Sequence, residues 1–349
     1  MNKILSIVIP AYSMEKYLSK CLDSLLIDTA LLETIEVLVI NDGSKDRTSE
    51  IAHSYEEKYP TVFRCIDKEN GNYGSCINRG LKEATGTYIK VLDADDTFDT
   101  KNFEEYVCYM NAYGGADCIF TDFCMVNEDG TVTKTITYPF LREQDFSITD
   151  LPDNINYSMW MHAVTYKTEN LRKINYNQTE GISYTDQEWI FLPMSTVKRI
   201  SYFPRIVYKY LVGRDGQTMN PETFCKNMWM EIKGTKVMVE EFESAKATFS
   251  EECMSYLTRQ IEKRCSYIYR WFLQFYPKQL NIVDLIEFDA YLKNKSPFLY
   301  KEVEKAKIEY RFLRFYFIKD FRKGKSLNFK LFYGLNYIKT IVRNFLKQN

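Results

Sequence analysis

Short apolar segments that alternate with helical patterns constrain the fold of the first 100 residues most strongly. Residues 4–9 and 36–40 are rich in Val, Ile and Leu and lack polar alternation, as expected for parallel strands buried on both faces. Between them, apolar residues within 18–26 recur at helical spacing, and Ser13 is expected to cap that helix. This β–α–β order predicts an α/β fold.

The following segments continue this pattern and then change it. The further predicted elements are a helix over 44–58, a strand over 62–66, a helix over 77–84 and a strand over 87–92. Residues 117–126 and 131–138 then read as two strands joined by a turn, which favours antiparallel pairing. We therefore expect a mixed, mainly parallel central sheet.

Segments that carry an acidic or aromatic residue stand at the ends of four predicted strands. They are Pro10-Ala11-Tyr12, Asn41-Asp42-Gly43, Asp67, and the run from Asp93 through Ala94 and Asp95 to Asp96. Ligands of open α/β sheets collect at the carboxyl ends of the strands. Because adjacent carboxylates repel one another, a cation such as Mg²⁺, held by a carboxylate and substrate phosphates, is the natural partner of the last run. The sequence also lacks a G-x-G-x-x-G or Walker lysine motif, so phosphates are expected to meet a metal.

These strand ends carry a resemblance to a known family. The matching runs are Ser6 to Tyr12, Glu36 to Asp46, Asn78-Arg79-Gly80 and Leu92 to Asp96, and in order and spacing they resemble the family 2 glycosyltransferases with the GT-A fold. The resemblance implies an inverting transfer, of the hexosyltransferase class, from a nucleotide-diphosphate sugar, usually a UDP-sugar, with Mg²⁺ or Mn²⁺. The acceptor would be a hydroxyl of a glycan or lipid-linked molecule in cell-surface polysaccharide synthesis.

The resemblance also implies a role for each strand-end residue. The nucleotide-sugar pocket would comprise Pro10, Ala11, Tyr12, Asp42, Asp93 and Ala94. In that pocket, Asp42 would bind the uracil and Asp93 would approach the ribose. Asp95 would bind the metal, and Asp96 would face the sugar or the acceptor.

One position departs from the family pattern. Ile77 stands where many relatives carry an arginine, so the missing charge is supplied by Arg79 or Lys68 or is dispensable. For Asn78 and Gly80, a helix cap and tight packing are as plausible as a role in binding.

An inverting transfer also requires a general base that deprotonates the acceptor hydroxyl. The segment 181–189 resembles the family's acceptor-base region, which makes Asp186 the candidate base and Glu188 the reserve. The alternative is that Asp186 only caps a helix. Arg214, between glycines, would reach a phosphate as the site closes, or else lies in a surface turn. Trp160 and His162 would touch the acceptor, or else pack as a core pair.

The C-terminal third has a different composition. We expect a GT-A catalytic domain over 1–220, with nucleotide-sugar binding in 1–100 and the acceptor side in 101–220, followed by a helical accessory domain over 221–349. Residues 307–349 contain eleven Lys or Arg against two acids. The tail is amphipathic, with Leu331, Leu335, Ile338, Val342 and Phe345 on one stripe. The basic charge and the apolar stripe together predict that the tail is attracted to an anionic membrane surface. The alternative is packing on the catalytic domain or on a second subunit of an oligomer.

The remaining composition narrows the function further. A net charge of −1 argues against a nucleic-acid binder. Nine cysteines without a C-x-x-C pair, and only two histidines, predict free thiols in a cytoplasmic protein and no zinc site. No apolar run is long enough to span a membrane, so a membrane-bound form would be peripheral on the inner face of the cell membrane. A nucleotidyltransferase and a non-catalytic GT-A-like scaffold are the alternative functions.

Overall fold

The structure is a computed structural model that describes residues 3–112, 114–140, 146–147, 159–214, 221–310, 313–325, 327 and 329. The chain divides into two compact units. The first comprises 1–220 with 249–253, and the second comprises 221–248 with 254–349.

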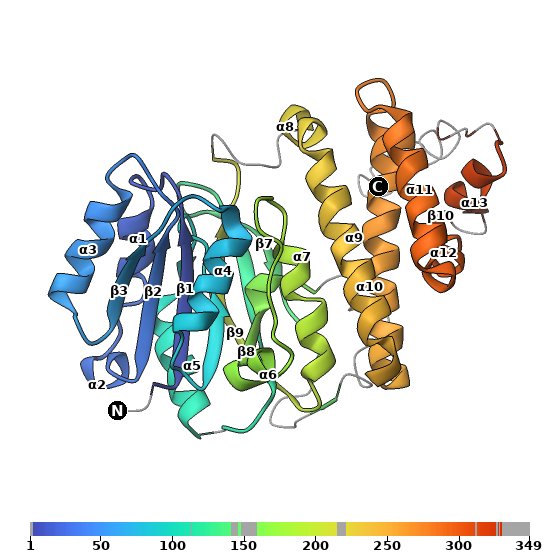
Figure 1. The fold of residues 1–349 in the computed structure, drawn as a ribbon. Coiled ribbons are helices and arrows are strands. Elements are labelled where there is room, and N and C mark those ends of the chain that lie inside the picture. Colours follow the sequence, from blue (N-terminus) through green and yellow to red (C-terminus); the bar gives the residue numbers. More distant parts are fainter. Residues whose placement is uncertain are drawn as a thin grey trace, which may run out of the picture. The chain divides into compact units, whose positions relative to one another are not determined.

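A mixed sheet forms the centre of the first unit (Figure 1). Its strands are β1 (Leu5–Ala11), β2 (Ile35–Asn41), β3 (Phe63–Asp67), β4 (Tyr88–Val91), β5 (Thr97–Phe98), β6 (Cys118–Val126), β7 (Val132–Ile136), β8 (Val164–Lys167) and β9 (Ile200–Leu211). The order is β3-β2-β1-β4-β8-β6-β9-β5, with β7 paired to β6. The first four strands are parallel, and β8 pairs antiparallel with β4 and β6. The predicted fold class is confirmed. The sequence patterns did not reveal β5 and β8.

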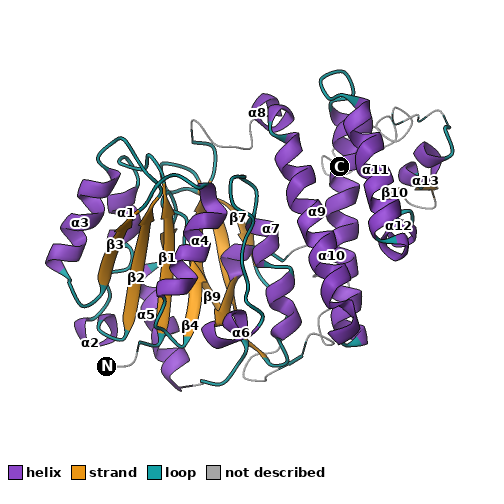
Figure 2. Cartoon of the chain, in the orientation of Figure 1, coloured by secondary structure: helices purple, strands orange, loops and turns teal. Residues whose placement is uncertain are grey.

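Burial along the strands explains why the apolar runs form this sheet. Every residue of β1 and β2 is buried, as in parallel strands covered on both faces. The helices of this unit are α1 (Leu18–Asp23), α2 (Thr29–Leu32), α3 (Thr48–Lys58), α4 (Asn72–Glu83), α5 (Thr100–Ala112), α6 (Thr168–Lys173) and α7 (Asp186–Trp189). Figure 2 shows α4 lying across the front of the strands. Gly80 permits this packing, because a Cβ there would lie 2.3 Å from Cγ1 of Val8.

Two helix starts differ from the predictions. Ser13 does not cap α1: it has φ 55°, and the helix begins after Tyr17. The backbone amides of Ser13 and Met14 instead donate to the side chains of Ser44 and Thr48, so the loop after β2 and the first residue of α3 hold this turn. Helix α4 begins at Asn72 rather than at residue 77, because residues 72–76 continue the helix toward the N-terminus.

Helices dominate the second unit. They are α8 (Pro221–Lys226), α9 (Met228–Ala245), α10 (Glu251–Arg270), α11 (Ile282–Lys295), α12 (Pro297–Val303) and α13 (Phe317–Arg322), with an antiparallel pair of short strands, β10 (Ile308–Tyr310) and β11 (Leu313–Phe315). Arg264 of α10 pairs with Glu231 of α9 at 2.8 Å, and both side chains are at most 10% exposed. Removing one partner would leave a buried charge, so the pair favours this helix register.

The predicted amphipathic stripe within 331–349 lies outside the described residues. Among the helices that are described, none combines the length and the apolar character that a membrane crossing requires.

Candidate active site

The parallel register brings the strand ends to one edge of the sheet. Ala11 of β1 lies beside Asn41 of β2, and Val8 lies beside Val91 of β4. The pairing extends one residue past β2, since the amide of Asp42 donates to the carbonyl of Ala11 at 2.9 Å. Tyr12, Asp42 and the acidic run after β4 therefore leave the sheet at the same edge.

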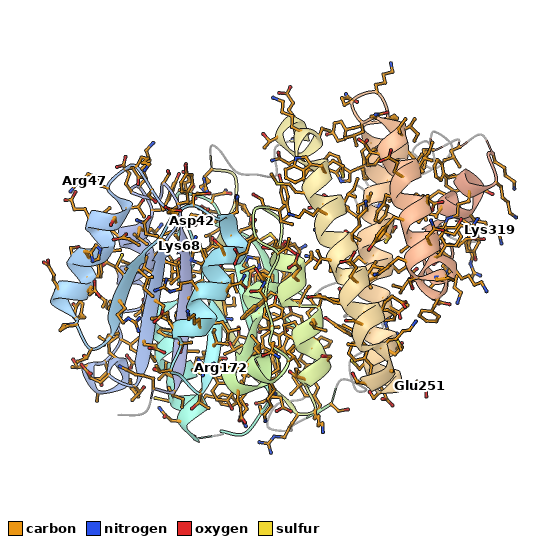
Figure 3. All side chains as sticks on the ribbon, viewed as in Figure 1. Asp42, Arg47, Lys68, Arg172, Glu251 and Lys319 are labelled. Atoms are coloured by element: carbon orange, nitrogen blue, oxygen red, sulfur yellow. The ribbon has the colours of Figure 1, made fainter. Side chains whose placement is uncertain are left out.

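Asp42 is held in place by a buried ion pair. Its Oδ1 accepts from Nζ of Lys68 at 2.6 Å and from the amide of Gly71 at 2.9 Å. The side chain of Asp42 is 4% exposed and that of Lys68 is 17% exposed. Figure 3 labels both residues near the carboxyl ends of the strands. Lys68 also donates to the hydroxyl of Ser75, so it joins β3 to α4.

These contacts distinguish the two candidates for the missing arginine charge. Ile77 is fully buried, so its position cannot present a polar group to a ligand without rearrangement. Arg79 pairs with Glu83 one helical turn away, at 2.9 Å. Of Lys68 and Arg79, Lys68 is the one that contacts Asp42, the residue predicted to bind the uracil.

The three predicted β1 residues differ in accessibility. Pro10 and Ala11 are buried within the strand, whereas Tyr12 is 50% exposed. Tyr12 is therefore the residue of this group that offers an open aromatic surface to a ligand.

The three carboxylates of the acidic run after β4 lie in three different environments. Oδ1 of Asp93 accepts from the hydroxyl of Tyr73 at 2.7 Å. Oδ2 of Asp95 pairs with Nε of Arg214 at 2.5 Å. The carboxylate of Asp96 is 1% exposed and accepts from the Tyr208 hydroxyl and from the Leu211 amide, both at 2.6 Å.

Asp96 therefore differs from the prediction that it faces the sugar or the acceptor. Each of its two carboxylate oxygens accepts a hydrogen bond from β9, so the side chain is turned toward that strand. The Tyr208 hydroxyl also accepts from the Asp93 amide at 3.1 Å. Asp96 and Tyr208 thus fix the backbone that carries Asp93 and Asp95.

The loop after β9 brings Arg214 into the site. The guanidinium carbon lies 5.3 Å from the centre of the Tyr17 ring, and the Tyr17 hydroxyl donates to Glu128 at 3.0 Å. Gly213 has φ 84°, a conformation that glycine adopts without strain, and it lets the chain turn toward Asp95. Arg214 thus forms an ion pair with Asp95, the carboxylate that was predicted to bind the metal.

The electrostatics of the acidic run favour a cation. Burial, followed by the charge of Asp95, raises the pKa of Asp93 and Asp96 above the usual range of a carboxyl. A hard divalent ion would offset this repulsion, and a single carboxylate together with a diphosphate is a usual Mg²⁺ ligand set. Asp95, with Asp93 nearby, fits such an ion.

A second group of potential metal ligands comprises Asp93, Asp96 and His162, whose ligand atoms lie within 4.8 Å of one another. The two hydrogen bonds of Asp96 to β9 compete with this use, so we favour Asp95 as the main ligand.

His162 differs from the prediction that it contacts the acceptor. It is 5% exposed and packs between Phe123, at 5.3 Å, and Tyr210, at 4.6 Å between ring centres. Burial and the charge of Lys90 lower its pKa to about 3, so the imidazole is neutral. This is the core packing that the sequence left open as an alternative. Trp160, 6.0 Å from His162, is partly exposed.

The segment before α7 is fixed to α4. Asn78 donates to the carbonyl of Gln178 at 3.0 Å and accepts from its amide at 2.7 Å. A Cβ on Gly74 would lie 2.2 Å from the carbonyl oxygen of Thr179, so only glycine fits there without movement. Asn78 therefore joins the donor side of the sheet to the segment that carries Asp186.

Asp186 is the first residue of α7, and Thr185 holds the N-cap position. Asp186 is partly exposed, and its negative charge contributes to the raised pKa of Tyr73 and Asp93, so it lies near these two residues. Glu188 is 3% exposed and accepts from the Thr179 amide at 2.8 Å. Of these two acids, Asp186 is the one available to a substrate.

Sequence reasoning missed three residues of the site: Tyr73, Gln178 and Tyr208. Each acts through a contact between distant segments, such as the Tyr73 hydroxyl on Asp93. Tyr208 and Tyr210 are two residues apart in a strand, so their side chains lie on the same face. This spacing was the one sequence signal that a tyrosine belongs to the site.

Comparison with known proteins agrees with this geometry. Residues 6–174 match the model of the family described as "Glycosyl transferase family 2". The chain is 30% identical over 215 residues to "Uncharacterized glycosyltransferase YibD" of Escherichia coli (strain K12), covering 59% of this chain and 60% of the relative. It is 25% identical over 228 residues to "Minor teichoic acid biosynthesis protein GgaB" of Bacillus subtilis (strain 168), covering 65% of this chain and 25% of the relative.

The chain spans only part of such relatives: 25%, 42% and 29% of the length of three of them. Among solved structures it resembles S. aureus TarS 1-349, with a TM-score of 0.60, 19% identity and 93% of each chain covered. The complex of the same TarS fragment with UDP-GlcNAc gives a TM-score of 0.53 at 17% identity, again with 93% of each chain covered. At these identities the likeness establishes the GT-A type of fold.

Proposed function

We propose that this chain, whose residues 6–174 belong to glycosyl transferase family 2, transfers a sugar from a nucleoside diphosphate donor to a hydroxyl of a glycan or lipid-linked acceptor. The observation that carries the proposal is that Asp42 and Asp95 lie at one edge of the sheet, while Asp186 is partly exposed and near enough for its charge to act on Asp93.

We infer that the donor is a UDP-sugar. Asp42 has a second carboxylate oxygen besides the one that binds Lys68, and it can accept from the N3–H of uracil. Lys68 already donates to Asp42, to the Glu69 carbonyl and to Ser75, so it could donate to a uracil carbonyl only in exchange for one of these acceptors. Tyr12 can stack on the base. The solved TarS complexes with UDP-GlcNAc and UDP, which share the fold, support this choice.

The acceptor is proposed to be part of a cell-surface polymer. The relative named for minor teichoic acid biosynthesis supports this class of acceptor. The nine cysteines are free thiols, which supports a reducing compartment and thus the cytoplasmic side of the membrane.

The proposed mechanism is a single displacement with inversion at the anomeric carbon. Asp186 accepts the proton of the acceptor hydroxyl as its oxygen attacks. Asp95 would hold Mg²⁺ or Mn²⁺, which when bound stabilises the negative charge on the departing diphosphate. Arg214, released from Asp95, can donate to a phosphate oxygen. The hydrogen bonds between Asn78 of α4 and the backbone of Gln178 hold the segment that leads to Asp186 against the part of the fold proposed to bind the nucleotide sugar.

A donor screen tests this function. Because ligands that bind only the native state raise the melting temperature, UDP-sugars with Mn²⁺ should raise it more than GDP- or dTDP-sugars do. NMR of the transferred or hydrolysed sugar should then show the anomeric configuration opposite to that of the donor. Retention of configuration would contradict the inverting mechanism, and release of diphosphate from a nucleoside triphosphate would indicate a nucleotidyltransferase instead.

A further inference from the structure

A histidine, a cysteine and an aspartate meet on the outer side of the edge strand β3, apart from the acidic run after β4. His53 lies in α3, and Cys65 and Asp67 are two residues apart on β3, so their side chains share one face of the strand. One ligand atom of each lies within 4.8 Å of the other two. The composition predicted no zinc site, because these three residues are distributed over a helix and a strand without metal-site spacing.

We propose that His53, Cys65 and Asp67 form a binding site for a divalent transition-metal ion, with Zn²⁺ as the best match. Imidazole nitrogen, thiolate sulfur and carboxylate oxygen are the three ligand types that Zn²⁺ takes in proteins. Three protein ligands leave a fourth, open position for water or another molecule. This site is independent of the proposed sugar transfer.

The distances suit a tetrahedral ion. Zn–S of about 2.3 Å and Zn–N or Zn–O of about 2.1 Å place neighbouring ligand atoms roughly 3.4–3.6 Å apart. Nε2 of His53 lies 2.9 Å from Oδ2 of Asp67, and Sγ of Cys65 lies 3.9 Å from Oδ1. These two contacts use different oxygens of Asp67, and the single ligand atoms that the three residues would offer to an ion lie within 4.8 Å of one another. Side-chain movements of about 1 Å bring such a set into the required range.

The surroundings already orient the ligands. Nδ1 of His53 lies 2.8 Å from Oε2 of Glu56, the carboxylate–histidine arrangement that fixes the tautomer of metal-binding histidines. Oδ1 of Asp67 accepts from Asn41 at 2.7 Å and from Ser49 at 2.8 Å. These two donors fix the Asp67 carboxylate with its other oxygen toward the histidine.

The cluster is accessible and carries excess negative charge. The side chains of His53 and Asp67 are 44% and 50% exposed, so an ion can enter from solvent. Burial, followed by the charges of Asp67 and Glu56, raises the pKa of Cys65 to about 12. Hydrogen bonds to Asp67 and Glu56 raise the pKa of His53. A cysteine thiol loses its proton when it binds a metal ion, so the affinity of the site should increase with pH.

Titration of the full chain with Co²⁺ tests the site, because a thiolate ligand gives Co²⁺ a near-ultraviolet charge-transfer band. We expect this band in the wild type and its loss in Cys65→Ser, while Cys108→Ser, which alters an exposed cysteine elsewhere, keeps it. Zn²⁺ affinity, measured by chelator competition, should fall by about 100-fold or more in Cys65→Ser and His53→Gln, and by about 10- to 100-fold in Glu56→Gln.

Separate controls distinguish this site from the proposed donor site. Asp95→Asn should leave the Co²⁺ band unchanged, whatever its effect on sugar transfer. Circular dichroism of the metal-free variants verifies folding, and two different ligand variants protect the test against the failure of one. The proposal is overturned if the wild type shows no band, if the band survives Cys65→Ser, or if His53→Gln binds Zn²⁺ as tightly as the wild type.

Discussion

Nε of Arg214 lies 2.5 Å from Oδ2 of Asp95, so a cation from the loop after β9 neutralises the carboxylate predicted to bind the donor's metal. Both side chains are at most 15% exposed, which makes the pair stronger than a surface salt bridge. A divalent ion and this arginine therefore compete for one carboxylate oxygen.

Replacing Arg214 should strengthen the binding of a metal in the absence of nucleotide. In Arg214→Ala, Mn²⁺ no longer displaces a guanidinium, and its affinity should rise several-fold, which corresponds to about 1 kcal/mol. Electron paramagnetic resonance of free Mn²⁺ measures this directly. The matched control is Arg205→Ala, which alters an exposed pair with Glu105 and should leave Mn²⁺ affinity unchanged. Weaker Mn²⁺ binding in Arg214→Ala would show that the arginine does not compete with the ion.

Removing the charge of Lys68 should lower stability. Lys68→Met leaves the buried carboxylate of Asp42 with the Gly71 amide but without its cation, at a cost of about 3 kcal/mol in the free energy of unfolding. Urea unfolding with an unchanged m-value measures the loss. Arg47→Met, which removes an exposed pair with Glu50, should lower the free energy of unfolding far less. Equal losses in the two variants would contradict the role of the buried pair.

Adding a methyl group at Gly74 should impair transfer more than donor binding. The Cβ of Gly74→Ala would lie 2.2 Å from the Thr179 carbonyl oxygen, so the segment leading to Asp186 must move. A displacement of roughly 1 Å can lower kcat on the order of 10²-fold. Steady-state kinetics and UDP titration separate the two effects. Gly114→Ala, whose new methyl group has 3.7 Å of room, should behave as the wild type. An unaltered kcat in Gly74→Ala would refute the positioning role.

The pKa values of the two histidines should be shifted in opposite directions from the ordinary value. Hydrogen bonds to Asp67 and Glu56 raise the pKa of His53, whereas burial lowers the pKa of His162 to about 3. The contribution of His53 to stability is thus present below the unfolded pKa of about 6.5 and lost as pH rises through its folded pKa. His162 has the opposite sign, because the unfolded state alone gains a proton as pH falls below about 6.5. NMR titration of metal-free protein can follow both rings, and a His162 signal that titrates near pH 6.5 would contradict its buried position.

The early strands were predictable from sequence because burial on both faces selects continuous Val, Ile and Leu runs, as in β1 and β2. Strand β5 was not, since two residues carry no period. The start of α4 was misjudged because Gly71 and Asn72 signal a loop, while the contacts of Gly74 with the segment at Thr179 select a helix.

The same limit applies to the site. Strand-end acids such as Asp42 and Asp95 follow from the order of the elements, because parallel strands end at one edge. The burial of Asp96 and His162 could not be foreseen, since both pack against Tyr208 of β9, which lies 112 residues from Asp96 and 46 residues from His162 in the sequence. The cluster of His53 with Cys65 depends in the same way on α3 packing against β3.

The most direct test of the proposed function compares Asp186→Asn with the wild type in one donor-binding and single-turnover experiment. If Asp186 is the general base, UDP-sugar affinity should stay within a few-fold of the wild type, while the rate of transfer falls by about 10²- to 10⁴-fold. Asp129→Asn, the same substitution in an exposed turn, should alter neither quantity. Full transfer activity in Asp186→Asn would contradict the account.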